Sequence, residues 1–251
     1  MKSILKYLLF VVFNISPLVA VFPDAIGENG AVTSSSKHAS QIGIDVLKNG
    51  GNAIDAAIAV GFALSVTFPN AGNLGGGGFM VIRTSSGEVR TIDFREVAPE
   101  NAFRDMYLDE NGDVISGMSL YTAHASGVPG TVAGFEYAHE RFGTKSWNYL
   151  LRPSIQLATN GFELSFRDAM YLNASRSFFL RDKESAKIFA AQDNYSVGDL
   201  FIQKDLAKTL RRISIGGADE FYKGVTSDMI VQCMKRTGGI ITKADLANYR
   251  P

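Results

Sequence analysis

The sequence has very few of the residues that cross-link a chain or bind a metal. It contains one cysteine, Cys233, and three histidines, His38, His124 and His139. A single cysteine cannot form a disulfide within the chain, so stability must come from the core even in an oxidising compartment. No His-Glu-x-x-His, Cys-x-x-Cys or acidic calcium loop occurs, so we expect neither a metal nor a cofactor.

The sequence also lacks a net charge, because its 25 basic and 25 acidic residues cancel. It therefore has no electrostatic footprint for nucleic acid and no polybasic segment for an anionic membrane. With 251 residues, 46% hydrophobic and 20% charged, it has the composition of a globular protein that can bury one large core. A small or neutral partner fits such a chain better than a nucleic acid does.

Long apolar runs are missing as well, apart from a short one at the start of the chain. Residues 1–20 combine a basic start, an apolar stretch and an end at Leu18-Val19-Ala20 that could precede a cleavage site. This pattern predicts a secretory signal peptide, a periplasmic or secreted location, and one domain over residues 21–251. The alternative is a membrane anchor at residues 4–20, but Pro17 and polar neighbours shorten its apolar stretch below the roughly 20 residues that span a bilayer.

The remaining sequence mixes helical and strand patterns, which indicates an α/β protein. Asn52 can cap the helix that follows it, because its side-chain oxygen can accept a bond from an unpaired amide of the first turn. Gly50-Gly51 and Gly238-Gly239 supply residues that tolerate the left-handed conformation at a helix end. We predict helices over 37–49, 53–66, 132–141, 147–160, 204–213 and 228–237, and a hairpin of strands over 79–82 and 89–94.

Four consecutive glycines, Gly75 to Gly78, precede the first predicted strand. A phosphate-binding loop would need a following lysine-serine or lysine-threonine pair and a helix, and neither is present. Two interpretations stay open. The glycines allow backbone segments to cross closely in a core, or their amides line a cleft and face a substrate.

Nucleophilic catalysis finds little support within the chain. No serine lies in a Gly-x-Ser-x-Gly elbow, and the three histidines are scattered, so each is interpreted as a surface or loop residue. Cys233 lies within a predicted helix without an activating neighbour, and we interpret it as a buried packing residue.

Arg95 is the one candidate binding residue. It follows the second predicted strand directly, where a side chain can be held firmly and still reach a cleft. Its guanidinium group could pair bidentately with a carboxylate. The equally simple alternative is a structural ion pair with Asp93 or Glu96.

Several motifs, taken together and in order, resemble the γ-glutamyltranspeptidase family. The resemblance covers essentially the whole chain after residues 1–20. The motifs are Gly50-Gly51-Asn52-Ala53-Ile54-Asp55-Ala56-Ala57, Gly72-Asn73-Leu74-Gly75-Gly76-Gly77-Gly78-Phe79-Met80, Asp93-Phe94-Arg95-Glu96, Ser126-Gly127-Val128-Pro129-Gly130-Thr131, Asp219-Glu220-Phe221-Tyr222-Lys223-Gly224 and Gly238-Gly239-Ile240-Ile241-Thr242.

This resemblance implies an amino-terminal-nucleophile hydrolase fold, a four-layer αββα sandwich that is incomplete without a small subunit. The family precursor cuts itself in two, and the new amino-terminal threonine attacks the γ-amide of glutathione, with its α-amine serving as base. The γ-glutamyl group then passes to water or to an amino acid or peptide acceptor. The family arginine that binds the α-carboxylate of the donor matches Arg95.

The resemblance also implies that the nucleophilic threonine lies beyond Pro251, so that no catalytic residue is expected in this chain. Thr33, Thr67, Thr122 and Thr242 are expected to be structural or loop residues. We therefore expect the chain alone to be inactive and to expose strand edges and an apolar face. The enzymatic hypothesis is the large-subunit part of a glutathione hydrolase; the alternative is an inactive truncated remnant or a secreted γ-glutamyl-binding module.

Overall fold

The computed structural model describes residues 26–251, which belong to two units. Residues 26–31 of the first unit contain no helix or strand, and Val32–Pro251 forms the second, compact unit. The predicted signal peptide at residues 1–20, and the anchor considered as its alternative, lie outside the described residues. Between residues 26 and 251, every helix is too short or too polar to cross a membrane.

Helices make up most of the second unit, with two short antiparallel strand pairs, β1–β2 and β3–β4. All eight elements predicted from the sequence are present, and the class is mixed α and β as expected. In chain order the elements are α2 (Lys37–Lys48), α3 (Ala53–Thr67), β1 (Phe79–Arg83), β2 (Val89–Asp93), α4 (Met118–Tyr121), η1 (Ala123–Ala125), α5 (Thr131–Phe142), α6 (Trp147–Asn160), β3 (Phe162–Glu163), α7 (Phe166–Ala174), α8 (Arg176–Phe179), α9 (Lys183–Phe189), β4 (Leu200–Phe201), α10 (Lys204–Lys223), α11 (Val225–Thr237) and α12 (Lys243–Asn248).

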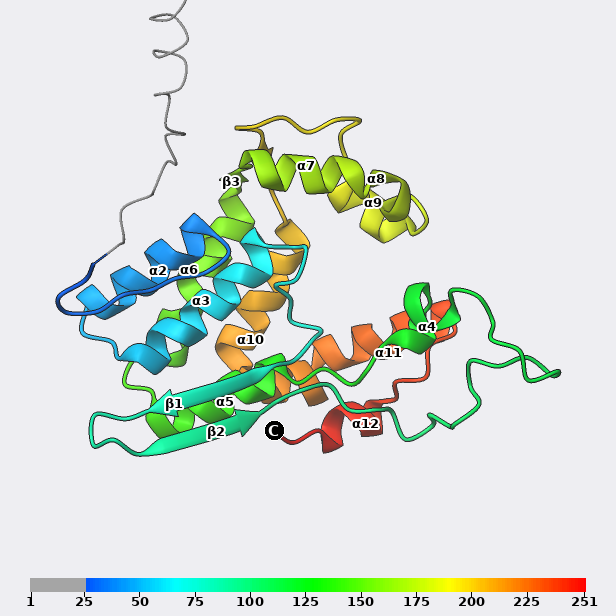
Figure 1. The fold of residues 1–251 in the computed structure, drawn as a ribbon, viewed down its shortest axis with the longest axis horizontal. Helices are drawn as coiled ribbons and strands as arrows, with labels where there is room; N and C mark the ends of the chain where they lie inside the picture. Colours follow the sequence, from blue (N-terminus) through cyan, green and yellow to red (C-terminus); the bar gives the residue numbers. More distant parts are fainter. Residues whose placement is uncertain (1–25) are drawn as a thin grey trace, which may run out of the picture. The chain divides into compact units, whose positions relative to one another are not determined.

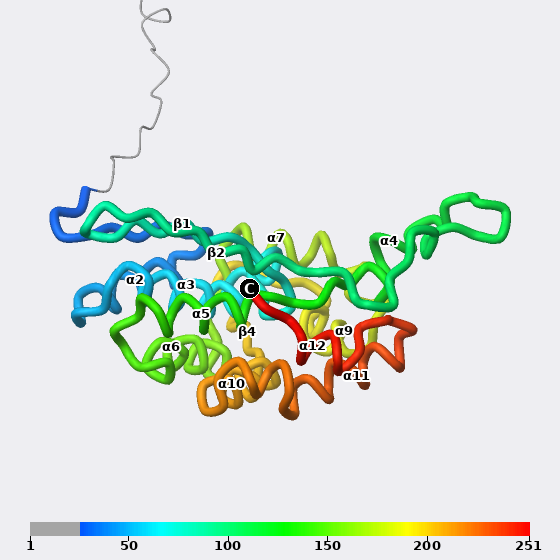
Figure 2. The backbone as a smooth tube through the Cα atoms, turned by 90° about the horizontal axis from the view of Figure 1, so that it is seen from below, coloured from blue at the N-terminus to red at the C-terminus, as the bar shows by residue number. Residues whose placement is uncertain are grey.

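Within this unit, helices cover one face of the β1–β2 hairpin (Figure 1). Figure 2 shows the hairpin along one side, with α2, α3 and α5 next to it and α6 and α10 beyond them. Helix α3 lies at the centre of the helices, packed against α2, α5 and α6. Its Phe62 is fully buried, and its ring meets Phe135 and Trp147 edge-on at 5.2 and 5.3 Å. The core of the unit is therefore organised around α3.

The start of α3 is fixed by a capping box, which confirms the predicted role of Asn52. Its side-chain oxygen accepts bonds from the amides of Ile54 and Asp55, both at 2.9 Å, and the Asp55 carboxylate accepts one from the Asn52 amide. Asp55 is fully buried and also accepts bonds from the hydroxyl and amide of Thr144 and from the amide of Lys145. Burial raises the pKa of Asp55, but these hydrogen bonds outweigh it and hold the pKa below its ordinary value.

The hairpin is buried on one face and bare on the other. Ile82 and Ile92 point toward the helices and are 4% and 5% exposed. Phe79 and Val81 alternate with them on β1 and are 64% and 73% exposed. An apolar strand face left uncovered in this way matches the expectation that the chain exposes one side of its sheet.

Helix α10 continues ten residues beyond its predicted end at residue 213. Gly217 interrupts it with a positive φ of 63°, a conformation that glycine adopts without steric penalty. Glu136 of α5 accepts a 2.7 Å hydrogen bond from the amide of Ala218 at this kink. A glycine break followed by a capping carboxylate therefore joins the predicted helix to a second helical segment that the sequence pattern did not indicate.

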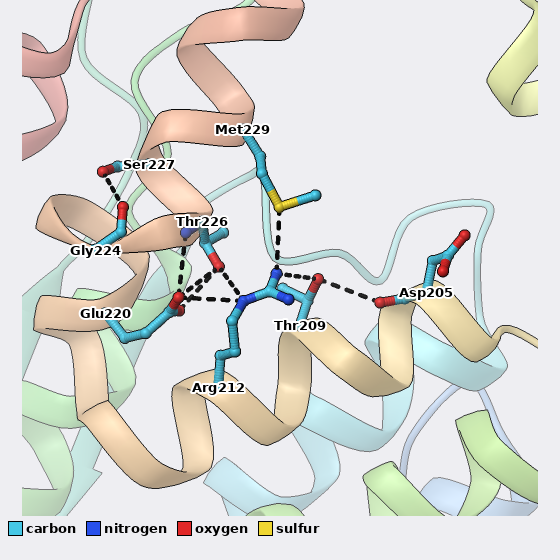
Figure 3. Close-up of polar contacts among 8 residues, drawn as sticks. All are labelled: Asp205, Thr209, Arg212, Glu220, Gly224, Thr226, Ser227 and Met229. Atoms are coloured by element: carbon cyan, nitrogen blue, oxygen red, sulfur yellow. Dashed lines mark hydrogen bonds and ion pairs between the residues drawn. The ribbon is translucent and has the colours of Figure 1, made fainter.

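A half-buried polar cluster connects α10 to α11 (Figure 3). Arg212 donates to Glu220 at 3.2 Å and to Thr209 at 3.0 Å. Glu220 also accepts bonds from the amide and the hydroxyl of Thr226, in the first turn of α11. The carboxylate thus caps α11 from the preceding helix, which explains why α11 begins at Val225 rather than at the predicted residue 228.

Candidate functional site

Three of the segments singled out in the sequence meet at the end of the hairpin. The Gly76 carbonyl accepts hydrogen bonds from the amides of Gly130 and Thr131 at 2.8 and 2.9 Å. Gly78 and Phe94 exchange two backbone hydrogen bonds, of 2.9 and 3.3 Å. The glycine run, the end of β2 and the start of α5 are therefore tied together by their backbones.

The glycines permit this close crossing. A Cβ atom at Gly77 would lie 2.8 Å from the Arg95 Cα and would overlap the Phe94 carbonyl. A Cβ at Gly130 would overlap both the Phe94 carbonyl and the Tyr249 hydroxyl. The interpretation of tight backbone packing in the glycine run is confirmed at Gly77, and Gly130, before α5, permits the same close approach. The run also continues into strand β1 and not into a helix, unlike a phosphate-binding loop.

Arg95 lies at this crossing, directly after β2, as the sequence predicted. Its backbone amide donates to the Asp93 carboxylate at 2.9 Å, and its carbonyl accepts a 2.7 Å hydrogen bond from the Tyr249 hydroxyl. Its guanidinium carbon lies 5.7 Å from the centre of the Phe79 ring. Across residues 26–251, no carboxylate lies within 4.0 Å of this guanidinium group, so the structural ion pair with Asp93 or Glu96 is not formed.

The side chain of Arg95 is exposed, while its backbone bonds to Asp93 and Tyr249 and lies close to Gly77. A guanidinium group without a carboxylate partner retains its full capacity for bidentate binding of an anion. The fixed backbone also fixes the direction in which the side chain leaves the Cα atom. A substrate-binding role for Arg95 stays a prediction on this geometry.

Two stacked tyrosines, Tyr222 and Tyr249, form hydrogen bonds with the segments that meet at this crossing. The rings of Tyr222 and Tyr249 lie 5.7 Å apart and nearly parallel, at 8°. The Tyr222 hydroxyl donates to the Pro129 carbonyl at 2.8 Å and accepts from the Ala133 amide at 3.2 Å. Burial raises the pKa of Tyr249 to about 12, with Asp93 and Glu96 adding to the shift, and burial also raises the pKa of Tyr222. Both hydroxyls therefore keep their protons at neutral pH and can donate.

Sequence reasoning missed both tyrosines as parts of the site. Tyr222 stands in one of the recognised motifs, but nothing in the local pattern indicates that its hydroxyl reaches the loop before α5. Tyr249 lies 154 residues from Arg95 along the chain. No periodicity or spacing signal connects positions so far apart.

The histidines lie on three separate elements, His38 on α2, His124 in η1 and His139 on α5. His38 is exposed, as expected, whereas His124 and His139 are half-buried, and Nε2 of His139 lies 2.7 Å from the Lys145 carbonyl oxygen. The prediction for Cys233 is wrong. It is half-buried rather than buried, because its face of α11 is only partly covered, and its sulfur lies 3.7 Å from Arg236 Nη2.

The threonines considered above have structural roles where their contacts are described. The hydroxyls of Thr67, at the end of α3, and Thr122, directly after α4, donate to carbonyls one turn earlier, at 2.9 and 2.6 Å. Thr242 caps α12 through a capping box with Asp245. In the part of the chain that the structure describes, no group of three or more His, Cys, Asp or Glu side chains could hold a metal.

Comparison with known proteins relates this arrangement to one family. A family model described as gamma-glutamyltranspeptidase matches residues 39–251. The chain is 50% identical over 225 residues to the glutathione hydrolase proenzyme of Pseudomonas sp. strain A14, covering 89% of this chain and 39% of that protein. It therefore spans about two fifths of the length of that relative.

Solved structures agree in fold as well as in sequence. The gamma-glutamyltranspeptidase of Helicobacter pylori superposes with a TM-score of 0.88 at 49% identity, covering 91% of this chain and 66% of the other. The enzyme from Pseudomonas nitroreducens, complexed with L-DON, superposes with a TM-score of 0.84 at 42% identity, covering 90% and 66%. The mixed α/β arrangement of the chain is thus the corresponding part of a larger fold.

Proposed function

Because this chain belongs to the γ-glutamyltranspeptidase family, we propose that it is the large-subunit portion of a γ-glutamyltransferase that also acts as a glutathione hydrolase. Its donor would be glutathione or a related γ-glutamyl compound. The acceptor would be water, an amino acid or a peptide. The relative from Pseudomonas is a glutathione hydrolase proenzyme, which supports both the activity and a processed precursor.

The observation that carries this proposal is the state of Arg95. Its guanidinium group is exposed and has no ion-pair partner among residues 26–251, while its backbone is fixed by Asp93, Tyr249 and the glycine crossing. A guanidinium fork matches the two oxygens of a carboxylate. The α-carboxylate of a γ-glutamyl donor would bind there, which favours donors with a free α-carboxylate over cephalosporin-type acyl groups.

The chemical step would use a threonine supplied by the small subunit. Its hydroxyl would attack the γ-carbonyl carbon, its proton would pass to the threonine α-amine, and the carbon–nitrogen bond of the amide would break. Cysteinylglycine would leave with that proton on its amine, and a γ-glutamyl ester would remain. Water or an acceptor amine would then release the γ-glutamyl group. The contribution of Arg95 to this reaction is to position the donor.

The bare face of the hairpin supports a small-subunit partner. Phe79, Val81 and Val89 expose 64%, 73% and 57% of their surface on adjacent strands. These side chains share the face with their cross-strand partners Asp93, Thr91 and Arg83. Exposed large apolar side chains gathered in this way are typical of a surface that another chain or segment covers. A second sheet packed on it would complete the αββα sandwich. We also propose export of the precursor, on the signal-like pattern of residues 1–20.

The experiment is hydrolysis of a chromogenic γ-glutamyl anilide. It compares the purified chain with the completed protein, meaning this chain produced together with the sequence that follows it in its genome. We expect release of the anilide only from the completed protein. Activity of the chain alone would contradict its role as a partial catalytic unit. An inactive completed protein would contradict the enzymatic proposal and favour a remnant or a γ-glutamyl-binding module.

A further inference from the structure

The backbone of Arg95 is fixed by a side chain distant in the sequence. The Tyr249 hydroxyl donates to the Arg95 carbonyl at 2.7 Å, and Tyr249 itself is only 6% exposed. Its ring stacks on Tyr222, whose hydroxyl bonds to the Pro129 carbonyl and the Ala133 amide. The carbonyl of Arg95 is therefore attached, through two tyrosines, to α10 and to the first turn of α5.

The other end of Arg95 is supported by an aromatic ring. Its guanidinium carbon lies 5.7 Å from the centre of Phe79, within the range in which a cation is attracted to a ring face. Phe79 pairs with Asp93 across the two strands, and Asp93 holds the Arg95 amide. Strand register therefore places the ring beside the guanidinium group, although Phe79 contributes little to the core of this chain.

These contacts hold both the backbone and the guanidinium group of Arg95, the residue proposed to bind the donor. We propose that Tyr249 and Phe79 are positioning residues for Arg95, which hold its guanidinium group in the direction needed to bind a donor carboxylate. The inference rests on the proposed function and extends it from the binding residue to the residues that orient it. A small misplacement of a substrate clamp weakens binding strongly, because two parallel hydrogen bonds must align at once.

The first test is Tyr249→Phe in the completed protein, assayed with the γ-glutamyl anilide. The substitution removes the hydroxyl but keeps the ring that stacks on Tyr222. We expect the donor KM to rise about fivefold, which corresponds to the loss of one net hydrogen bond, while kcat changes less than about twofold. A merely structural role would reduce the amount of active enzyme, and so the apparent kcat, without raising KM.

Tyr195→Phe is the matched control. Tyr195 is 5% exposed, and its hydroxyl also donates to a backbone carbonyl, that of Ile188 at 3.3 Å. It has no contact with Arg95, so its substitution should leave the donor KM unchanged. An equal rise of KM in the control would show that loss of any buried tyrosine hydroxyl has this effect, and would overturn the proposal for Tyr249.

Phe79→Leu tests the second contact independently of Tyr249. Phe79 is largely exposed in this chain, and leucine keeps an apolar side chain on the strand face that the small subunit would cover in the completed protein. We expect the donor KM to rise about threefold through loss of the contact between the ring and the cation. If Tyr249→Phe fails to mature, this variant decides the proposal for Phe79, and an unchanged KM refutes it.

Arg95→Lys in the same assay separates the inference from the function on which it rests. If Arg95→Lys raises the donor KM while Tyr249→Phe and Phe79→Leu leave it unchanged, the positioning proposal fails and the proposed function stands. If Arg95→Lys has no effect on KM, the assignment of Arg95 fails, and the positioning proposal fails with it.

Discussion

The helices around α3 bury their large apolar side chains, whereas the β1–β2 hairpin leaves some of its own exposed. Phe62 of α3 is fully buried and meets two aromatic rings, whereas Phe79 of β1 is 64% exposed. The polar groups also differ, because the buried Asp55 carboxylate has partners for both oxygens and the Arg95 guanidinium has no carboxylate partner among the described residues. The helical side thus holds the buried core of the unit, and under the proposed function the exposed hairpin side would bind a partner and a substrate.

Substitutions on the two sides should separate these roles. Phe62→Ala should have the largest effect on the free energy of unfolding. Removing a fully buried aromatic ring costs about 3–5 kcal/mol through lost transfer energy and the remaining cavity. We expect this loss of unfolding free energy in the completed protein, measured by urea denaturation, and a similar loss in the chain alone.

Val81→Ser is the matched change on the hairpin, where the side chain is 73% exposed. In the chain alone it should change the unfolding free energy by less than about 0.5 kcal/mol. In the completed protein it should cost about 1–3 kcal/mol, because a covered valine gains the energy of burial. An equally small effect in both forms would mean that no partner covers this face.

Asp55→Asn should have the next largest effect, about 2–3 kcal/mol, because the buried amides and hydroxyl lose a charged acceptor. The folded pKa of Asp55 is lowered, so the carboxylate contributes stability above its ordinary pKa of about 3.9 and loses it as the pH falls through the lower folded value. The stability of the variant should therefore depend less on pH below about 4, as urea denaturation at several pH values would show.

Asp168 provides the control, since it completes the capping box of α7 at a more exposed site. Asp168→Asn should cost no more than about 1 kcal/mol. Equal losses for the two aspartates would contradict the account of Asp55 as a buried junction between α3 and the loop before α6.

Local patterns predicted most of the fold because their causes are local. The capping box at Asn52, the positive φ of 76° at Gly238 and the alternation along β2 depend on residues a few positions apart. The elements α4, η1, α7 to α9, α12, β3 and β4 were missed. They are short, and several depend on distant partners, as when β3 pairs with β4.

The same distinction between local patterns and distant contacts applies to the candidate site. The position of Arg95 after a strand could be read from the sequence, and so could the tolerance of the glycine run for close packing. The contacts that fix Arg95 could not, because Tyr249 and the loop before α5 approach it only through the tertiary structure. The error at Cys233 has a related cause, since an amphipathic helix pattern does not reveal how fully a partner covers each face.

The most direct test of the account compares two donors in the Arg95→Lys variant of the completed protein. A γ-glutamyl anilide carries the α-carboxylate, and a 4-aminobutyryl anilide is the same donor without it. We predict that Arg95→Lys raises KM about tenfold for the first and leaves KM for the second unchanged, because an ammonium group cannot reproduce the two parallel bonds of guanidinium. Equal changes for the two donors, or an unchanged KM for the γ-glutamyl anilide, would contradict the assignment of Arg95 to the donor carboxylate.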